Sequence, residues 1–210
     1  MTRLGQLYRV KYLQKYGKTY GGEKVIEIGC HDGRMLSEIN AGLRVGLDIE
    51  PRKSAQDIAL VKADGFFTPL RDRSFDVIYL LDVVEHVKDD QKLVSEMLRI
   101  LKPGGKLILT TPHINIRLFP PFLTSWISIR WGHVLRRGYS VEQLRSLVNQ
   151  ESKVEICELQ ASWYRKLYLL LKILFFISPK LTGKLLDILL TYESKDPYGS
   201  NGFLLLELTK

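Results

Sequence analysis

The sequence predicts an α/β protein with a mostly parallel sheet that is covered by helices on both faces. Short runs rich in Val, Ile and Leu recur along the chain, and stretches with helical periodicity separate them. The runs lack the strict apolar and polar alternation of a half-exposed sheet, so the strands should be buried on both faces. The expected strands lie near residues 24–28, 43–48, 58–62, 75–81, 106–111, 153–159 and 202–208.

The composition is that of an ordinary globular protein. The chain has 210 residues, of which 45% are hydrophobic and 26% charged, and one domain over residues 1–210 is expected. Cys30 and Cys157 provide neither a disulfide framework nor a metal-type spacing. The basic, polar-interrupted first residues do not resemble a secretory signal, so we expect a cytoplasmic protein. The formal net charge of +8 favours an anionic partner, which is a nucleic acid, an acidic membrane or a phosphorylated substrate.

Two helices between the strands are clearly signalled. Residues 91–101 place apolar side chains on one face, and the Lys-Pro-Gly-Gly run at 102–105 is expected to end that helix. Ser140 is a good N-cap residue and Gln143 stands at the capping-box position, which predicts a helix starting at residue 141.

Residues 1–20 also show helical periodicity. Leu4, Leu7 and Tyr8 recur near one face, while the basic residues, Arg9 among them, are expected outside it. The helix either covers a bound cofactor or packs on the edge of the sheet.

Residues 162–199 exceed the usual length of a connection between two strands. We expect an amphipathic helical insertion, with one helix over 163–177 and a second over 181–192. The first is too short and too charged to span a bilayer. The insertion is either a packed subdomain or dimer interface, or an apolar lid or peripheral membrane surface for a lipid-like substrate.

The most informative segment is the apolar run 24–28 and the turn that follows it. Gly29 and Gly33 bound this turn and allow a tight backbone close to a ligand, and a helical pattern begins at Arg34. His31 stands where the dinucleotide fingerprint requires a second glycine, which disfavours a pyrophosphate.

Asp48 follows the next apolar run. An acidic residue at that strand end is placed to accept hydrogen bonds from both hydroxyls of a ribose. The turn and this acid together predict a nucleoside-type cofactor with an unphosphorylated ribose.

The chain resembles the class I S-adenosylmethionine-dependent methyltransferases, in particular the group that includes quinone-biosynthesis enzymes. The resemblance covers roughly residues 23–160 and the last strand. It is carried by Glu27-Ile28-Gly29-Cys30-His31-Asp32-Gly33, Gly46-Leu47-Asp48, Ala63-Asp64, Ser74-Phe75-Asp76, Glu85-His86-Val87 and Leu101-Lys102-Pro103-Gly104-Gly105, in the family's order. It implies a three-layer Rossmann-like sheet of seven strands with the last strand antiparallel, and S-adenosyl-L-methionine as cofactor.

The resemblance also implies roles for individual residues. Gly29, Cys30 and Gly33 would shape the loop around the methionine portion, with Glu27 beneath it. Asp48 would bind the ribose, and Asp64 would accept a hydrogen bond from the adenine amino group. The cofactor site would be completed by Ile49, Gly65 and Leu81.

Asp82, Glu85 and His86 follow the fourth strand, where α/β sheets expose their active sites. With His133 they resemble the metal cluster of some O-methyltransferases, although Asp82 replaces the family's first glutamate and shortens the reach. The alternatives are a proton-accepting role for His86, with Glu85 beside it, and structural support.

The leading hypothesis is methyl transfer to a small-molecule or lipid-like acceptor at oxygen or carbon. A metal-assisted RNA 2′-O-methyltransferase is the alternative, supported by the net charge, but no appended RNA-binding module is recognisable, which disfavours a nucleic-acid partner. A dehydrogenase or a non-enzymatic protein of the same fold would be the remaining classes.

Overall fold

The structure is a computed structural model. It describes residues 4–15, 18, 20–52, 57–130, 135, 138–148, 153–159, 161–193 and 202–210.

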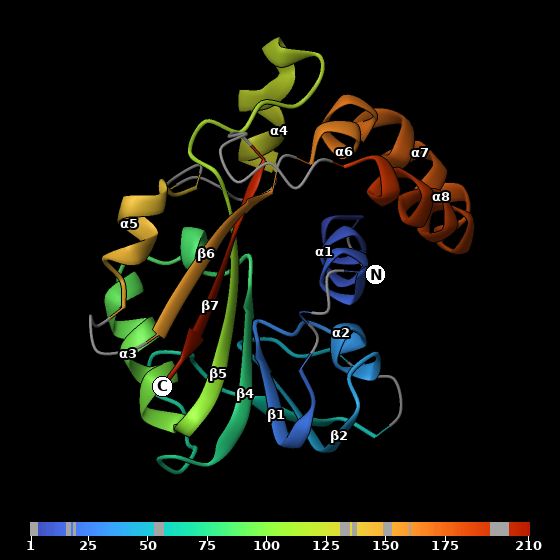
Figure 1. Cartoon of the computed structure of the whole chain (residues 1–210). Helices are drawn as coiled ribbons and strands as arrows, with labels where there is room; N and C mark the ends of the chain where they lie inside the picture. The colour runs from blue at the N-terminus through green and yellow to red at the C-terminus, as the bar shows by residue number, and fades with distance from the viewer. Residues whose placement is uncertain are drawn as a thin grey trace.

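Seven strands form one sheet in the order β3-β2-β1-β4-β5-β7-β6 (Figure 1). The strands are β1 (Gly22–Ile28), β2 (Ala41–Asp48), β3 (Ala59–Lys62), β4 (Phe75–Leu81), β5 (Leu101–Pro112), β6 (Lys153–Leu159) and β7 (Phe203–Thr209). The first five pair in parallel, and β7 lies antiparallel to both β5 and β6. The expected mostly parallel sheet with an antiparallel last strand is confirmed.

Helices cover both faces of the sheet (Figure 1). They are α1 (Leu4–Lys15), α2 (Arg34–Ser37), α3 (Asp90–Ile100), α4 (Thr124–Arg130), α5 (Val141–Arg145), α6 (Ser162–Lys166), α7 (Tyr168–Ile177) and α8 (Pro179–Tyr192), with short 3-10 turns η1 (Val84–His86) and η2 (Pro121–Leu123). One core lies between the sheet and α3 and α5, and a second between the sheet and α1, α2 and α6–α8. Neighbouring residues of β1 supply both cores, Val25 to one and Ile26 to the other, which explains why the strand sequence does not alternate.

The predicted helix starts are found in the structure. Ser140 caps α5 by accepting from the Gln143 backbone N–H, and the Gln143 side chain accepts from the Ser140 backbone N–H, so the capping box is confirmed. The start of β5 differs from the expectation, because the chain enters this strand directly after α3 at Leu101. The Lys-Pro-Gly-Gly run therefore lies inside the strand, and the register with β4 is irregular between Phe75 and Val77.

The insertion forms three helices where the sequence suggested two. The first expected helix is interrupted at Leu167, and Ser178 caps α8 by accepting from the Leu181 backbone N–H. The last residues of the expected 162–199 insertion, 194–199, lie outside the described part of the chain. No helix within the described ranges is long and apolar enough to cross a membrane.

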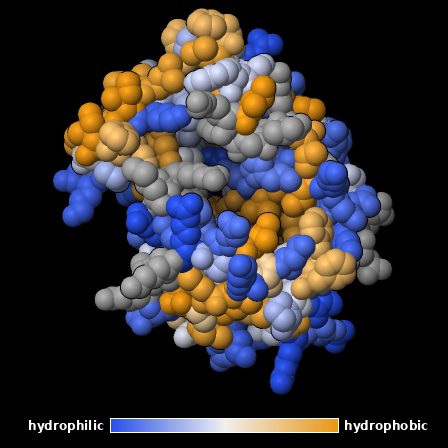
Figure 2. All heavy atoms as spheres, turned by 180° about the vertical axis from the view of Figure 1, so that it is seen from behind, coloured by the Kyte–Doolittle hydropathy of each residue, from blue (hydrophilic) through white to orange (hydrophobic). Residues whose placement is uncertain are grey.

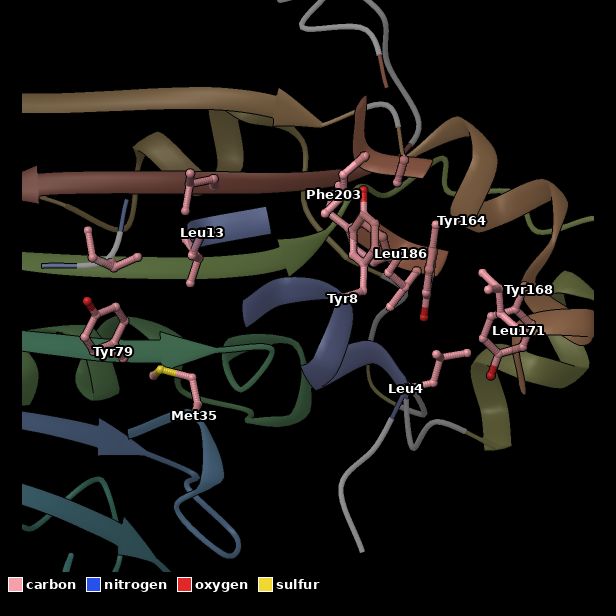
Figure 3. Packing of buried hydrophobic residues seen from close by; sticks show 14 of the residues in the cluster. Leu4, Tyr8, Leu13, Met35, Tyr79, Tyr164, Tyr168, Leu171, Leu186 and Phe203 are labelled. Atoms are coloured by element: carbon pink, nitrogen blue, oxygen red, sulfur yellow. The ribbon is translucent and has the colours of Figure 1, made fainter. Parts of the chain in front are cut away.

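Helix α1 lies between the sheet and this helical insertion. Tyr8 points toward Phe203 of β7 and Tyr164 of α6, with ring centroids 5.9 and 4.3 Å away (Figure 3). Lys11 of α1 also pairs with Asp187 of α8 at 2.8 Å. The expectation that Arg9 lies outside the packed face is wrong, because its side chain is only 3% exposed.

Candidate cofactor site

The turn after β1 has the backbone that the sequence predicts. Gly29 and Gly33 adopt positive φ angles of 74° and 70°, and the Gly33 N–H donates to the Cys30 carbonyl at 2.8 Å. His31 also has a positive φ, 54°, in the left-handed region where a side chain is costly. A Cβ on Gly29 would lie 2.7 Å from Val83 Cγ2, so the loop leaves no room for a side chain there.

Glu27 lies beneath this loop and is buried. Its Oε2 atom has no hydrogen-bond partner in the described part of the chain. Burial, and then the nearby Asp32 and Asp48, raise the pKa of the Glu27 carboxyl well above its usual range. A buried carboxylate without a partner is costly, and a cationic ligand would relieve that cost. The site therefore fits a cofactor that carries a positive charge.

Asp48 connects the two loops at the ends of β1 and β2. Its Oδ2 accepts from the His31 backbone N–H at 2.8 Å, and its Oδ1 accepts from the Glu50 backbone N–H at 3.0 Å. A carboxylate has about four acceptor positions, so two are left for ribose hydroxyls. Asp48 thus shapes the loop as well as being placed for the ribose.

Cys30 was expected in the cofactor site, and the structure buries its side chain below the loop. The position of a Cβ on Gly46 of β2 lies 2.6 Å from the Cys30 sulfur, so the thiol fills the space above this glycine. Burial, followed by the negative charges of Glu27 and Asp48, raises the pKa of the thiol to about 12. Its backbone is therefore the part of Cys30 that is available to a cofactor.

Asp64 and the residues expected to complete the cofactor site differ in their exposure. Asp64 is exposed and its Oδ1 accepts from the Phe66 backbone N–H at 3.0 Å. Ile49 is 70% exposed, and Leu81 is partly buried at the end of β4. Gly65 packs closely against α3, since a Cβ there would lie 3.0 Å from Leu93 Cδ1. The cofactor-binding roles of these residues stay predictions.

Asp82 forms an ion pair with Arg9 of α1, which the sequence did not predict. Arg9 Nη2 lies 2.6 Å from Asp82 Oδ2, and Arg9 Nε donates to Asp82 Oδ1 at 3.1 Å. Thr110 of β5 also donates to Asp82, at 3.1 Å. The guanidinium carbon of Arg9 lies 3.6 Å from the ring centroid of Phe203, which adds a cation–π contact. Periodicity gave no signal for this pair, because it placed Arg9 outside the apolar face of the N-terminal helix.

Glu85 and His86 lie in η1, directly behind Asp82. Glu85 is fully buried and accepts from the Thr111 hydroxyl at 3.2 Å. Burial, and then the charge of Asp82, raise the pKa of Glu85 well above its usual range. His86 Nε2 is 4.0 Å from Glu85 Oε1, and the His86 side chain is about one third exposed.

The metal cluster that was one alternative for Asp82, Glu85 and His86 finds no support within the described ranges. No group of three or more His, Cys, Asp or Glu side chains there is arranged to hold a metal ion. The fourth proposed ligand, His133, lies outside the described residues.

A surface cavity of about 330 Å³ lies between the start of α3 and α5. Its lining includes Asp90, Ile114, Tyr139 and Gln143. None of the residues that line this cavity belongs to the loop after β1. The expected cofactor site is therefore described by the geometry of that loop and not by this cavity.

The sheet order, the glycine-bearing turn after β1 and the acidic residues at the ends of β1 and β2 are together the features of a class I S-adenosylmethionine-dependent methyltransferase. Residues 26–109 match the family described as "Methyltransferase domain". This match covers less than half of the chain and agrees with the class that the sequence motifs predict.

Relatives with known names support the same class. A chloroplastic tocopherol O-methyltransferase from Arabidopsis thaliana is 29% identical over 120 residues, which are 50% of this chain and 34% of the relative. A ubiquinone biosynthesis O-methyltransferase from Coxiella burnetii is 28% identical over 131 residues, covering 53% of this chain and 52% of the relative. The chain thus spans between about a third and a half of these curated relatives.

A solved structure extends the likeness to almost the whole chain. An S-adenosylmethionine-dependent methyltransferase from Thermotoga maritima aligns with a TM-score of 0.64 and 23% identity, covering 99% of this chain and 91% of that one. This comparison shows the shared fold, including the region outside residues 26–109.

Proposed function

We propose that this protein transfers a methyl group from S-adenosyl-L-methionine to a small-molecule acceptor, at oxygen or carbon. The observation that carries the proposal is the buried Glu27 carboxyl group, one oxygen of which has no partner in the described part of the chain, beneath a loop that leaves no room for a side chain at Gly29. The cofactor bears a sulfonium and an ammonium, so it supplies the positive charge that this carboxylate lacks.

Different residues of the chain would bind different parts of the cofactor. Gly29, Gly33 and the Cys30 backbone would enclose the methionine portion, and Asp48 would accept from the ribose hydroxyls. Asp64 would accept a hydrogen bond from the adenine amino group, and Ile49, Gly65 and Leu81 would complete the cofactor site. The bound cofactor supplies a methyl group on a positively charged sulfur, which is open to in-line attack by a nucleophile.

His86 is the better candidate of the two residues expected to accept a proton from the acceptor. It is partly exposed at the carboxyl end of β4, whereas Glu85 is buried and its raised pKa favours the protonated form. In this proposal His86 accepts the proton and Glu85 positions the η1 turn through Thr111.

The RNA alternative finds less support. It rests on the net charge of +8 and on a metal cluster that the described residues do not form. The named relatives act, by their names, in tocopherol and ubiquinone chemistry, which favours a small, apolar acceptor for this chain as well. A contact of residues 163–192 with a membrane or with a second copy stays a prediction, as does a cytoplasmic or peripheral membrane location.

Isothermal titration with S-adenosylhomocysteine, run beside NAD, tests the proposal. We expect micromolar binding of S-adenosylhomocysteine and none of NAD. Asp48→Ala should weaken binding about 10- to 100-fold, because a charge-assisted hydrogen bond contributes about 1.5–3 kcal/mol. Since Asp48 also holds two backbone N–H groups, Asp48→Asn and a melting curve separate loss of the ribose partner from loss of the loop. Asp187→Ala, on α8, is the matched control. NAD binding, or unchanged affinity in Asp48→Ala, would contradict the assignment.

A further inference from the structure

Two segments far apart in the sequence carry large apolar side chains on their outer surfaces. In the first, η2 with α4, Phe122 is 80% exposed, and Trp126 and Ile129 are also exposed. In the second, α7 with the start of α8, Phe176 is 79% exposed. Its other exposed apolar residues are Leu169, Leu170, Ile173, Ile177 and Leu181. We refer to the two together as the apolar cap.

The two segments contribute to one core and are linked by a backbone hydrogen bond. Ile127 of α4 is buried in the same core as Tyr164 of α6 and Phe175 of α7. The Phe119 backbone N–H, just before η2, donates to the Arg165 carbonyl of α6 at 3.1 Å. Figure 2 shows hydrophobic atoms at the top and upper left of the molecule, where Figure 1 places α4 and α6–α8 once it is turned by 180°. The inner sides of the helices are thus already buried, and the outer sides are apolar as well.

This arrangement calls for a partner. A helix with one buried face normally presents polar residues to water, and large exposed apolar patches mark interaction surfaces. Helix α7 has ten residues and cannot cross a bilayer, so an interfacial position fits its length.

The charges of the cap are of one sign up to Asp187 of α8, which pairs with Lys11 of α1 at 2.8 Å. Residues 113–130 and 161–186 contain seven Lys and Arg residues and no Asp or Glu. Lys166, Lys172, Lys180 and Lys184 are exposed beside the apolar side chains of α7 and α8, and Arg117 is exposed just before η2. A basic rim around an apolar face is complementary to an anionic lipid surface.

The same charges disfavour a second copy of the chain. A two-fold contact brings the same patch of both copies together, so each basic rim would face another basic rim, and the nearby acid, Asp187, is already paired with Lys11. Lipid phosphates, in contrast, would neutralise these cations while the acyl chains take up the aromatic and aliphatic side chains.

We propose that the apolar cap, formed by η2 and α4 together with α7 and the start of α8, docks on an anionic lipid bilayer. Helices α7 and α8 contact α1, where Lys11 pairs with Asp187 of α8, and α1 reaches the carboxyl end of β4 through Arg9 and Asp82. A docked chain would therefore hold its expected active site close to the bilayer. The corollary, that the methyl acceptor is itself lipid-soluble, rests on the proposed function, whereas the docking does not.

Vesicle co-sedimentation of the full chain tests the docking. Phosphatidylcholine vesicles are compared with vesicles that contain about one third phosphatidylglycerol, and we expect strong, salt-sensitive binding to the second kind. Phe122→Ser and Phe176→Ser should each lower the partition coefficient about tenfold. Leu43→Ser, at an exposed apolar position of β2 outside the cap, is the matched control and should bind like the wild type. Lys180→Gln and Lys184→Gln should each lower binding to the anionic vesicles about fivefold.

Each other outcome overturns a defined part of the proposal. A chain that binds neither kind of vesicle, or whose Phe176→Ser variant binds as well as the wild type, has no lipid-docking cap. An effect of Phe176→Ser without an effect of Phe122→Ser would exclude α4 from the surface. A wild-type dimer that Phe176→Ser dissociates, without vesicle binding, would show that a second copy covers the cap. Titration of the same samples with S-adenosylhomocysteine keeps the two proposals apart, since a chain that binds vesicles but no cofactor contradicts only the proposed function.

Discussion

Replacing Glu27 by leucine should make the protein more stable and less able to bind its cofactor. Without a ligand, Glu27 is buried with one oxygen unpartnered, and its pKa is raised by burial first and by Asp32 and Asp48 second. A carboxyl with a raised pKa in the folded state contributes stability that is complete below its ordinary pKa of about 4.5 and is lost as the pH rises through the raised value. At pH 7 the wild-type chain therefore carries a penalty that the variant lacks.

The size of the effect follows from the burial of a single polar group. An unsatisfied buried polar group costs about 1–3 kcal/mol, so Glu27→Leu should gain about 2 kcal/mol at neutral pH. For a chain of 210 residues this corresponds to a rise in Tm of about 4–8 °C. The difference should shrink toward pH 4, where Glu27 is protonated in both the folded and the unfolded state.

Differential scanning calorimetry of both proteins across this pH range measures the gain. Titration with S-adenosylmethionine should show affinity reduced about 10- to 100-fold in the variant, because a charged partner of the ligand is gone. Glu27→Gln, which keeps a polar group, separates loss of charge from loss of shape. A lower Tm for Glu27→Leu at pH 7, or a difference in Tm that does not depend on pH, would refute the reasoning.

Two further predictions concern ion pairs that hold the N-terminal region and the sheet. Arg9→Leu should lower the free energy of unfolding in urea by about 3 kcal/mol, because Asp82 loses its buried cation. Arg9→Lys should restore part of the lost stability. Equal stability of Arg9→Leu and the wild type would contradict the prediction. For Glu207, burial alone would raise the pKa, but hydrogen bonds led by Lys106 lower it to about 2, so its contribution is present above about pH 4.5 and is lost as the pH falls toward 2. Glu207→Gln should therefore be less stable than the wild type at neutral pH by about 1–3 kcal/mol. Its Tm should also fall less steeply than that of the wild type as the pH is lowered from about 4.5 toward 2. A Tm that depends on pH as in the wild type would argue against this.

The sequence predicted the strands because most of them are compact apolar runs with their own boundary signals, and β6, Lys153–Leu159, alternates polar and apolar residues. Its errors lie where long-range packing overrides local signals. The Pro-Gly-Gly run at 103–105 normally ends an element, yet β5 already begins at Leu101, next to β4. The helix break at Leu167 likewise has no glycine or proline to announce it.

The residues of the candidate site also differ in how well the sequence predicts their positions. Gly29, Gly33 and Asp48 belong to short contiguous motifs, so their placement could be predicted from spacing alone. Arg9 and Asp82 are 73 positions apart, and periodicity assigned the arginine to the solvent face because isolated charges usually lie there. The exposed apolar residues of α4 were not anticipated either, since an apolar residue in a sequence is taken for core until its surroundings are known.

The position of β7 has a consequence for how the chain is made. Within the described sheet β6 pairs with β7 alone, although β6 is translated more than forty residues earlier. Until residues 203–209 leave the ribosome, β6 has no neighbour and β5 presents an open edge, which is an aggregation-prone state. Closure of the sheet must therefore wait for its final strand and for the slow, long-range pairing that this strand requires.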